Sequence, residues 1–203
     1  MPTSTKRKLQ VLRPRRGAPE ETRQRLVAAA ALLFNRHGYH GTDSNRIAHA
    51  ASYATGVFYK HFHNKREVFL AAYESWSASE WEEVAKVFAS GGSNREIARK
   101  LVAMSIEFHT RWRGLLASLR ELVFSDPVVR RFHRRQRRKQ LYRMADLRRK
   151  RGTRPHRKEE DLIHLYTTER TYDAIAQGDL RALGLSEKFF IEAMVQNVIA
   201  ALN

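Results

Sequence analysis

The stretch TGVFYKHF, residues 55–62, places aromatic side chains next to cationic ones. Such a combination occurs in ordinary cores, and it also occurs on surfaces that meet the phosphates and bases of nucleic acid. Helical spacing separates the two roles, because Phe58 and Phe62 are four residues apart and share one face. That face is expected to be buried. The outer face is then formed by Thr55, Gly56, Val57, Tyr59, Lys60 and His61.

Catalytic and metal-binding chemistry has few candidate residues. The chain has no cysteine, which excludes disulfides, thiolate metal sites and cysteine nucleophiles. It contains neither a glycine-rich phosphate loop nor a nucleophile motif. We expect no metal at the close pair His61 and His63, since His61 belongs to the outer face described above. The sequence therefore predicts a binding protein that is not an enzyme and needs no cofactor.

Charge is distributed unevenly along the 203 residues. The net charge is +17, residues 127–158 carry +14, and residues 159–203 carry −5. This asymmetry favours a polyanionic partner, although a solvated surface would also explain it. Residues 1–18 are expected to form a disordered basic arm that either contacts DNA or takes no part in binding. Its cations are Lys6, Arg7, Lys8, Arg13, Arg15 and Arg16.

Helical signals cover the remaining chain, and the alternation typical of strands is absent. Pro19 suits a first helical position, and Asp43 is a suitable N-cap for a short helix ending near Ala50. Asn64 and Ser93, each followed three residues later by a glutamate, have the form of capping boxes. We expect about nine helices, three short ones followed by six longer ones. No run of apolar residues is long enough for a membrane span.

Three short helices with a tight connection between the second and third have the outline of a helix-turn-helix unit. The segment GYHGTDSNRIAHAASYATGVFYKHFHNKREV, residues 38–68, resembles the DNA-binding signature of the TetR (tetracycline-repressor-like) family of bacterial regulators. The residues that carry the resemblance are Gly38, Tyr39, Ile47, Ala48, Ala51, Gly56, Phe58, Tyr59, His61, Phe62 and Lys65.

This resemblance implies an all-α fold in two parts. Residues 19–64 would form the helix-turn-helix DNA-binding domain, and residues 65–203 a helical ligand-binding and dimerisation domain. The implied DNA contacts are Ser44, Asn45, Thr55, Gly56, Val57, Tyr59, Lys60, His61 and Lys65.

Two positions depart from the family pattern. The turn reads Ser52-Tyr53-Ala54 where the family usually has Gly-Val-Ser, so Ser52 must accept a left-handed backbone or the turn must differ. Asn45 stands where a longer basic residue is common. Both departures leave the operator sequence open.

The C-terminal part is expected to dimerise and to enclose a small effector, again by resemblance. Burial of the same apolar residues inside one subunit is the alternative. The candidate interface consists of Leu162, Leu165, Tyr166, Tyr172, Phe190, Met194, Asn197 and Val198. Aromatic, Met and Gln positions on the middle helices are the pocket candidates: Trp76, Trp81, Met104, Phe108, Trp112, Phe132, Gln136, Gln140 and Met144.

The Arg-rich segment 130–151 either is a solvated face or serves an anionic or acyl-type effector, such as a coenzyme A thioester. Taken together, these features predict a cytoplasmic, homodimeric regulator, more a repressor than an activator, that binds a palindromic operator. Its effector would shift the helix that begins near Asn64. Two alternatives stay open: a sequence-nonspecific nucleic-acid-binding or compacting protein driven by charge, and a ligand-binding helical protein without a regulatory role.

Overall fold

The computed structural model describes residues 18–202, which form ten α-helices and no strand. The predicted basic arm lies outside the described residues, apart from Ala18. The helices are α1 (Pro19–His37), α2 (Ser44–Ala50), α3 (Thr55–His61), α4 (Lys65–Ala89), α5 (Asn94–Arg111), α6 (Arg113–Ser125), α7 (Pro127–Arg151), α8 (Lys158–Gln177), α9 (Asp179–Ala182) and α10 (Glu187–Leu202). The all-α prediction is confirmed, and the helix not foreseen is the four-residue α9.

The helices begin where the capping residues predict. The Asp43 carboxylate accepts from the Arg46 amide, and the Ser93 side chain forms a full capping box with Glu96. At α4 the box is incomplete: Asn64 accepts from the Glu67 amide, but the Glu67 carboxylate accepts from His63 N, at 2.7 Å, and not from Asn64. The start of α4 is thereby tied to the residues that directly follow α3.

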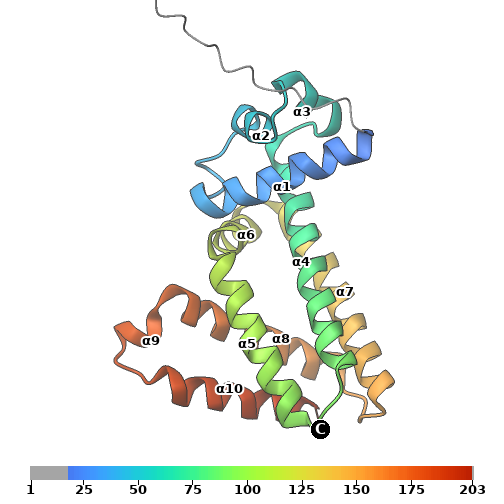
Figure 1. The fold of residues 1–203 in the computed structure, drawn as a ribbon, viewed down its shortest axis with the longest axis vertical. Helices are drawn as coiled ribbons and strands as arrows, with labels where there is room; N and C mark the ends of the chain where they lie inside the picture. Colours follow the sequence, from blue (N-terminus) through green and yellow to red (C-terminus); the bar gives the residue numbers. More distant parts are fainter. Residues whose placement is uncertain (1–17, 203) are drawn as a thin grey trace, which may run out of the picture.

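The upper part of the molecule is built from α1, α2, α3 and the beginning of α4 (Figure 1). Phe34, Ile47, Phe58 and Phe69 are fully buried where these helices meet. This core continues without interruption into α6 and α7, through residues such as Leu115, Leu119, Val129 and Phe132. The predicted boundary between residues 64 and 65 falls at the N-cap of α4, and the first turns of α4 pack into the same core as α1.

The lower part has α5 between α8 and α10, with α4 and α7 alongside (Figure 1). A second core there contains Ile97, Val102, Tyr172, Met194 and Val198. Within the described residues, no helix is both long enough and apolar enough to span a bilayer.

A side chain of α1 holds the junction between α5 and α6. The Asn35 Oδ1 accepts from the backbone amides of Gly114 and Leu115, at 3.0 and 3.2 Å, and its Nδ2 donates to the Arg111 carbonyl. Trp112, the N-cap residue of α6, forms no side-chain cap, so Asn35 satisfies amides that α6 leaves unpaired. The upper part of the molecule is therefore hydrogen-bonded to the first turn of α6.

Candidate DNA-binding surface and ligand cavity

The turn between α2 and α3 takes the backbone that its sequence demands. Ser52 has φ 63°, the only positive value at a non-glycine residue in the described part of the chain. Its amide donates to the His49 carbonyl, and the next amide, that of Tyr53, donates to Ala48. Of the two alternatives, the structure has the left-handed serine, and that conformation costs about 1–2 kcal/mol.

The two faces of α3 separate as predicted. Phe58 and Phe62 are buried against α1 and α4, while 56% of Tyr59 is exposed and Lys60 points to solvent. The other predicted contact residues of α2 and α3 are exposed or half-buried, and none of them is acidic. Asn45 and Gly56 are exposed, and Ser44, Thr55, Val57 and His61 are half-buried. The predicted contact residues of α2 and α3 are thus accessible to solvent at least in part, and their contact with DNA stays a prediction.

Gly56 has no role in the packing of the protein itself. A Cβ atom built there would have no other heavy atom within 4 Å, and the backbone is not in the left-handed region. Glycine within a helix costs about 1 kcal/mol relative to alanine. Neither the space around this position nor its backbone conformation requires a glycine at residue 56.

Lys65 differs from the rest of the predicted set, because it already has partners within the chain. Its Nζ donates to the Tyr39 carbonyl at 2.9 Å and lies 4.2 Å from the centre of the Tyr39 ring. Burial lowers the pKa of Lys65 from its usual value. The side chain therefore fastens the start of α4 to the loop after α1, and a phosphate contact from it stays a prediction.

A cavity of about 140 Å³ lies in the lower part of the molecule. Its walls come from α4, α5, α7, α8 and α10. The lining includes three predicted residues, Trp81, Gln140 and Met144. Leu101, Ser105 and His109 form the α5 wall, which is a stripe with a spacing of four residues.

The other pocket predictions were wrong as members of this cavity. Phe108 and Trp112 lie one helix position away from the Leu101–His109 stripe, so with Trp76 they line a groove between α1, α4 and α5. Phe132 packs in the upper core, and Gln136 donates to the Glu74 carboxylate at 3.1 Å. Met104 is half-buried on α5 outside the cavity.

The sequence prediction missed the charged groups around the cavity. The His109 Nδ1 lies 3.0 Å from an Asp173 oxygen, and its Nε2 lies 3.8 Å from Glu80 Oε1. Arg137 makes a two-pronged pair with Glu169. In the sequence, each of these residues is a charged or polar position within a helix. Such a position cannot be distinguished from an ordinary surface position without the fold.

The pKa values of Glu80 and Asp173 shift in opposite directions. For Glu80, burial raises the pKa to about 7. For Asp173, burial alone would raise the pKa, but the hydrogen bond from His109 and the charge of Arg120 outweigh it and hold the pKa below its usual value. Among the described residues, no group of three or more His, Asp or Glu side chains is placed to hold a metal ion.

The interface prediction chose the wrong side of α8 and α10 for four residues. Leu165, Tyr172, Met194 and Val198 are buried inside the single chain, because these helices turn that side toward α5. Leu162 and Phe190 are half-buried, while Tyr166 and Asn197 are exposed. The apolar side chains that do reach the surface in this region are Ile163, Tyr166, Leu183, Leu185 and Phe189.

The α2–turn–α3 arrangement, joined to helices that line a cavity, is that of a helix-turn-helix protein. Residues 26–72 match the family model for bacterial regulatory proteins of the tetR family. The match runs from Leu26 in α1 through α2 and α3 into the first turns of α4, so this part of the chain is similar to the tetR family.

Curated relatives align with only part of the chain. The probable acrEF/envCD operon repressor of Escherichia coli K12 is 43% identical over 49 residues, which are 24% of this chain and 22% of that protein. The chain therefore aligns with only about a fifth of the length of this curated relative.

Solved structures match over most of the chain. A TetR-family regulator structure from Rhodococcus sp. has a TM-score of 0.71 at 16% identity, covering 91% of this chain and all of that one. FadR from Bacillus subtilis, solved in complex with stearoyl-CoA, has a TM-score of 0.64 at 16% identity, covering 88% and 96%. At these identities the likeness establishes the fold.

Proposed function

We propose that the protein is a homodimeric transcription regulator, acting as a repressor, that binds a palindromic DNA operator through α3 and responds to a small effector. The observation that carries the DNA-binding part is the outer face of α3 (Thr55–His61). It presents hydroxyl, imidazole and ammonium groups beside an exposed glycine that the packing of the protein itself does not require. A helix of this kind enters the major groove with its first turn toward the base edges.

The flanking residues fit contacts to the DNA backbone. Lys60 is exposed on the last turn of α3, and the Tyr59 hydroxyl is carried on a ring that is 56% exposed. Such groups bind phosphate oxygens and fix the register of the helix in the groove. The charge-driven alternative, nonspecific binding to nucleic acid, does not require the α2–turn–α3 geometry that the chain has.

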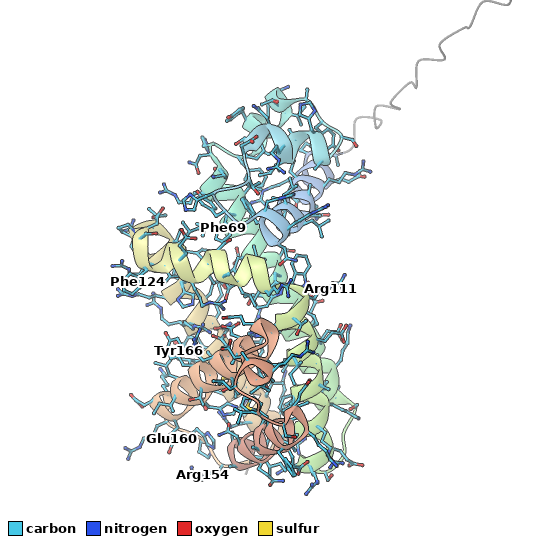
Figure 2. The ribbon with its side chains drawn as sticks, turned by 90° about the vertical axis from the view of Figure 1, so that its left-hand side faces the viewer. Phe69, Arg111, Phe124, Arg154, Glu160 and Tyr166 are labelled. Atoms are coloured by element: carbon cyan, nitrogen blue, oxygen red, sulfur yellow. The ribbon has the colours of Figure 1, made fainter. Side chains whose placement is uncertain are left out.

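In the proposed dimer, the α3 helix of a second copy of the chain binds the second half-site of the operator. One α3 helix reads only a few base pairs, and two helices about 34–36 Å apart match one turn of DNA. The surface for this contact is proposed on the side where α8, α9 and α10 lie together, which faces the viewer in Figure 2 and includes Tyr166. It exposes Ile163, Leu183, Leu185 and Phe189, large apolar residues that are costly to leave in water.

The effector is proposed to act through α4 and α6, the two helices that connect the cavity region to the DNA-binding helix α3. Helix α4 lines the cavity with Glu80, Trp81 and Val84 and follows directly on α3. Helix α6 is held to α1 by Asn35. A ligand that prefers one arrangement of α4 and α6 would change the separation of the two α3 helices in the dimer.

The acyl-type effector predicted from the Arg-rich segment has weak support at this cavity. The inward-facing cations of α7, Arg137 and Arg148, are already paired with Glu169 and Asp161. A volume of about 140 Å³ is close to that of a cavity which holds one benzene molecule. A chain of the length bound by Bacillus subtilis FadR would need a larger space.

The proposal places the protein in the bacterial cytoplasm, with the chromosome, and assigns it no catalytic step. It is tested by selecting bound duplexes from a random DNA pool, at low salt and again at raised salt. The expected result is a palindrome with half-sites about one turn apart that survives the raised salt. Recovery of unrelated sequences whose binding is lost steeply with salt would instead establish the nonspecific alternative.

A further inference from the structure

One buried carboxylate on the cavity wall lacks a hydrogen-bonding partner. Glu80 lines the cavity from α4, and its side chain is 14% exposed. Its nearest cationic atom is the His109 Nε2, at 3.8 Å, which is too long for a hydrogen bond. Within residues 18–202, Glu80 accepts no hydrogen bond. Buried carboxylates are normally paired, so this one has an unused capacity for a donor.

The neighbouring carboxylates are paired with arginines, whereas Glu80 has only the 3.8 Å contact with His109. Arg137 neutralises Glu169, Arg120 pairs with Asp173, and Arg148 pairs with Asp161. The remaining titratable group beside Glu80 is His109, whose Nδ1 is already directed to Asp173. The wall from α10 is apolar, since it consists of Val198, Ala201 and Leu202. Among these carboxyl groups, Glu80 is the one whose partner within 4 Å is a histidine and not an arginine.

The rest of the lining suits an apolar molecular body. Trp81, Val84, Phe88, Leu101, Met144 and Leu147 form most of the walls. At about 140 Å³, the cavity can hold a group about the size of a benzene ring. A site with apolar walls and one carboxylate that accepts no hydrogen bond suits a molecule that is cationic at one end and apolar at the other.

We propose that this cavity binds a small amphipathic amine, whose ammonium group donates to Glu80 while its apolar body fills the space between α4, α5, α7 and α10. The binding itself is independent of DNA. Its role as the effector signal rests on the function proposed above.

Protonation of Glu80 gives the binding a defined pH dependence. Burial raises the pKa of Glu80 to about 7, and the groups that face it are His109 from α5, Glu169 from α8 and Arg137 from α7. The amine binds the ionised carboxylate. Affinity therefore increases as the pH rises from 6 toward 8, while the amine remains protonated, and binding near pH 6.5 releases a proton.

The test is calorimetric titration of the full chain with benzylamine, and with benzyl alcohol and benzoate as neutral and anionic probes of the same size. Benzylamine should bind at least about ten-fold more tightly than either control at pH 8. Glu80→Gln should remove this preference. Glu82→Gln, an exposed change on the same helix, should preserve it.

Equal affinity for benzylamine and benzyl alcohol, tighter binding of benzoate, or no benzylamine binding to the wild-type chain would overturn the proposal. So would a Glu80→Gln variant that keeps the preference for benzylamine. The comparison of probes on the wild-type chain holds even if a variant folds poorly. Titration without DNA and operator selection without amine are separate experiments, so failure of one is distinguishable from failure of the other.

Discussion

Two glycines inside helices show how differently the same residue can be used. A Cβ at Gly56 would meet nothing within 4 Å, whereas a Cβ at Gly114 would lie 1.9 Å from the Asn35 carbonyl oxygen. Gly114 is thus required by the packing of α6 against α1. Gly56 is free of such a requirement, and in the proposed function its exposed backbone is what approaches the groove.

Gly56→Ala should therefore separate folding from DNA binding. We expect the free energy of unfolding to rise by up to about 1 kcal/mol, because alanine favours the helix. We expect operator affinity to fall, because the methyl group occupies the space between backbone and bases. Urea denaturation and fluorescence anisotropy with the selected operator measure the two effects. Unchanged affinity would mean that this turn of α3 does not approach the DNA closely.

At Glu80 the prediction concerns stability against pH. The folded-state pKa of about 7 lies above the ordinary glutamate value of 4.5, so the folded protein holds this proton more tightly than the unfolded chain. The contribution of Glu80 to stability is most favourable below about pH 4.5 and declines as the pH rises to about 7. Glu80→Gln removes this decline.

The Glu80→Gln variant should thus gain in Tm relative to wild type at pH 8 and show little difference at pH 5. Thermal melts of both proteins at a series of pH values measure the difference, with Glu82→Gln as the exposed control. A constant difference in Tm between pH 5 and pH 8 would contradict the raised pKa.

At the scale of elements, the contact between α1 and α6 joins the helix-turn-helix unit to the helices of the lower part of the molecule. The Asn35 side chain pairs with both ends of the α5–α6 junction, and the Tyr39 amide donates to the Ser118 hydroxyl at 3.0 Å. The Arg66 guanidinium adds an ion pair to Asp126, at 2.9 Å, between α4 and the start of α7. These contacts connect α6 and the start of α7 to the loop after α1 and to α4, so under the proposed function they would carry a displacement of α6 or α7 to the helix-turn-helix unit.

Gly114→Ala should disrupt this contact. The added methyl group collides with backbone, which cannot rotate away as a side chain would, and overpacking of this kind costs about 1–3 kcal/mol. The midpoint of urea unfolding should fall accordingly. Gly56→Ala is the matched control, because it makes the same chemical change in a helix with open space. Equal midpoints for the two variants would show that α1 and α6 can separate without cost.

At the scale of the whole molecule, the exposed apolar side chains are concentrated on the side of α8 and the α9–α10 region. Ile163 is 68% exposed and Phe189 is 76% exposed. A charge at either position would oppose burial against a second copy, while it leaves the single chain unaffected because neither side chain belongs to a core.

Ile163→Glu and Phe189→Glu are accordingly expected to shift the chain from dimer to monomer in analytical ultracentrifugation, with unchanged helical circular dichroism. Operator affinity should fall in parallel, since only a dimer can engage both half-sites. Phe124→Glu serves as the control, because Phe124 is 88% exposed at the end of α6, outside this side of α8–α10. A dimer that persists in both variants would place the interface elsewhere.

The amino-acid sequence by itself determined the helical class, most helix ends and the split between the two sides of α3. These features depend on local causes: capping residues such as Ser93, the four-residue spacing of Phe58 and Phe62, and the left-handed backbone imposed at Ser52. All of them are interactions within a few residues of the chain, so their pattern can be read along the sequence.

Only the tertiary structure decided which side of each C-terminal helix faces inward. Helical periodicity does not tell which of two apolar sides of one helix faces the core of the chain. Met194 and Val198 therefore cannot be assigned to the core from the sequence, and their burial follows from the packing of α10 on α5. The same holds for Glu80, His109 and Asp173, which lie on three different helices and become a group only when α4, α5 and α8 meet. That Glu80 accepts no hydrogen bond is likewise a property of this three-dimensional neighbourhood, because the low dielectric around it comes from residues distant in the chain.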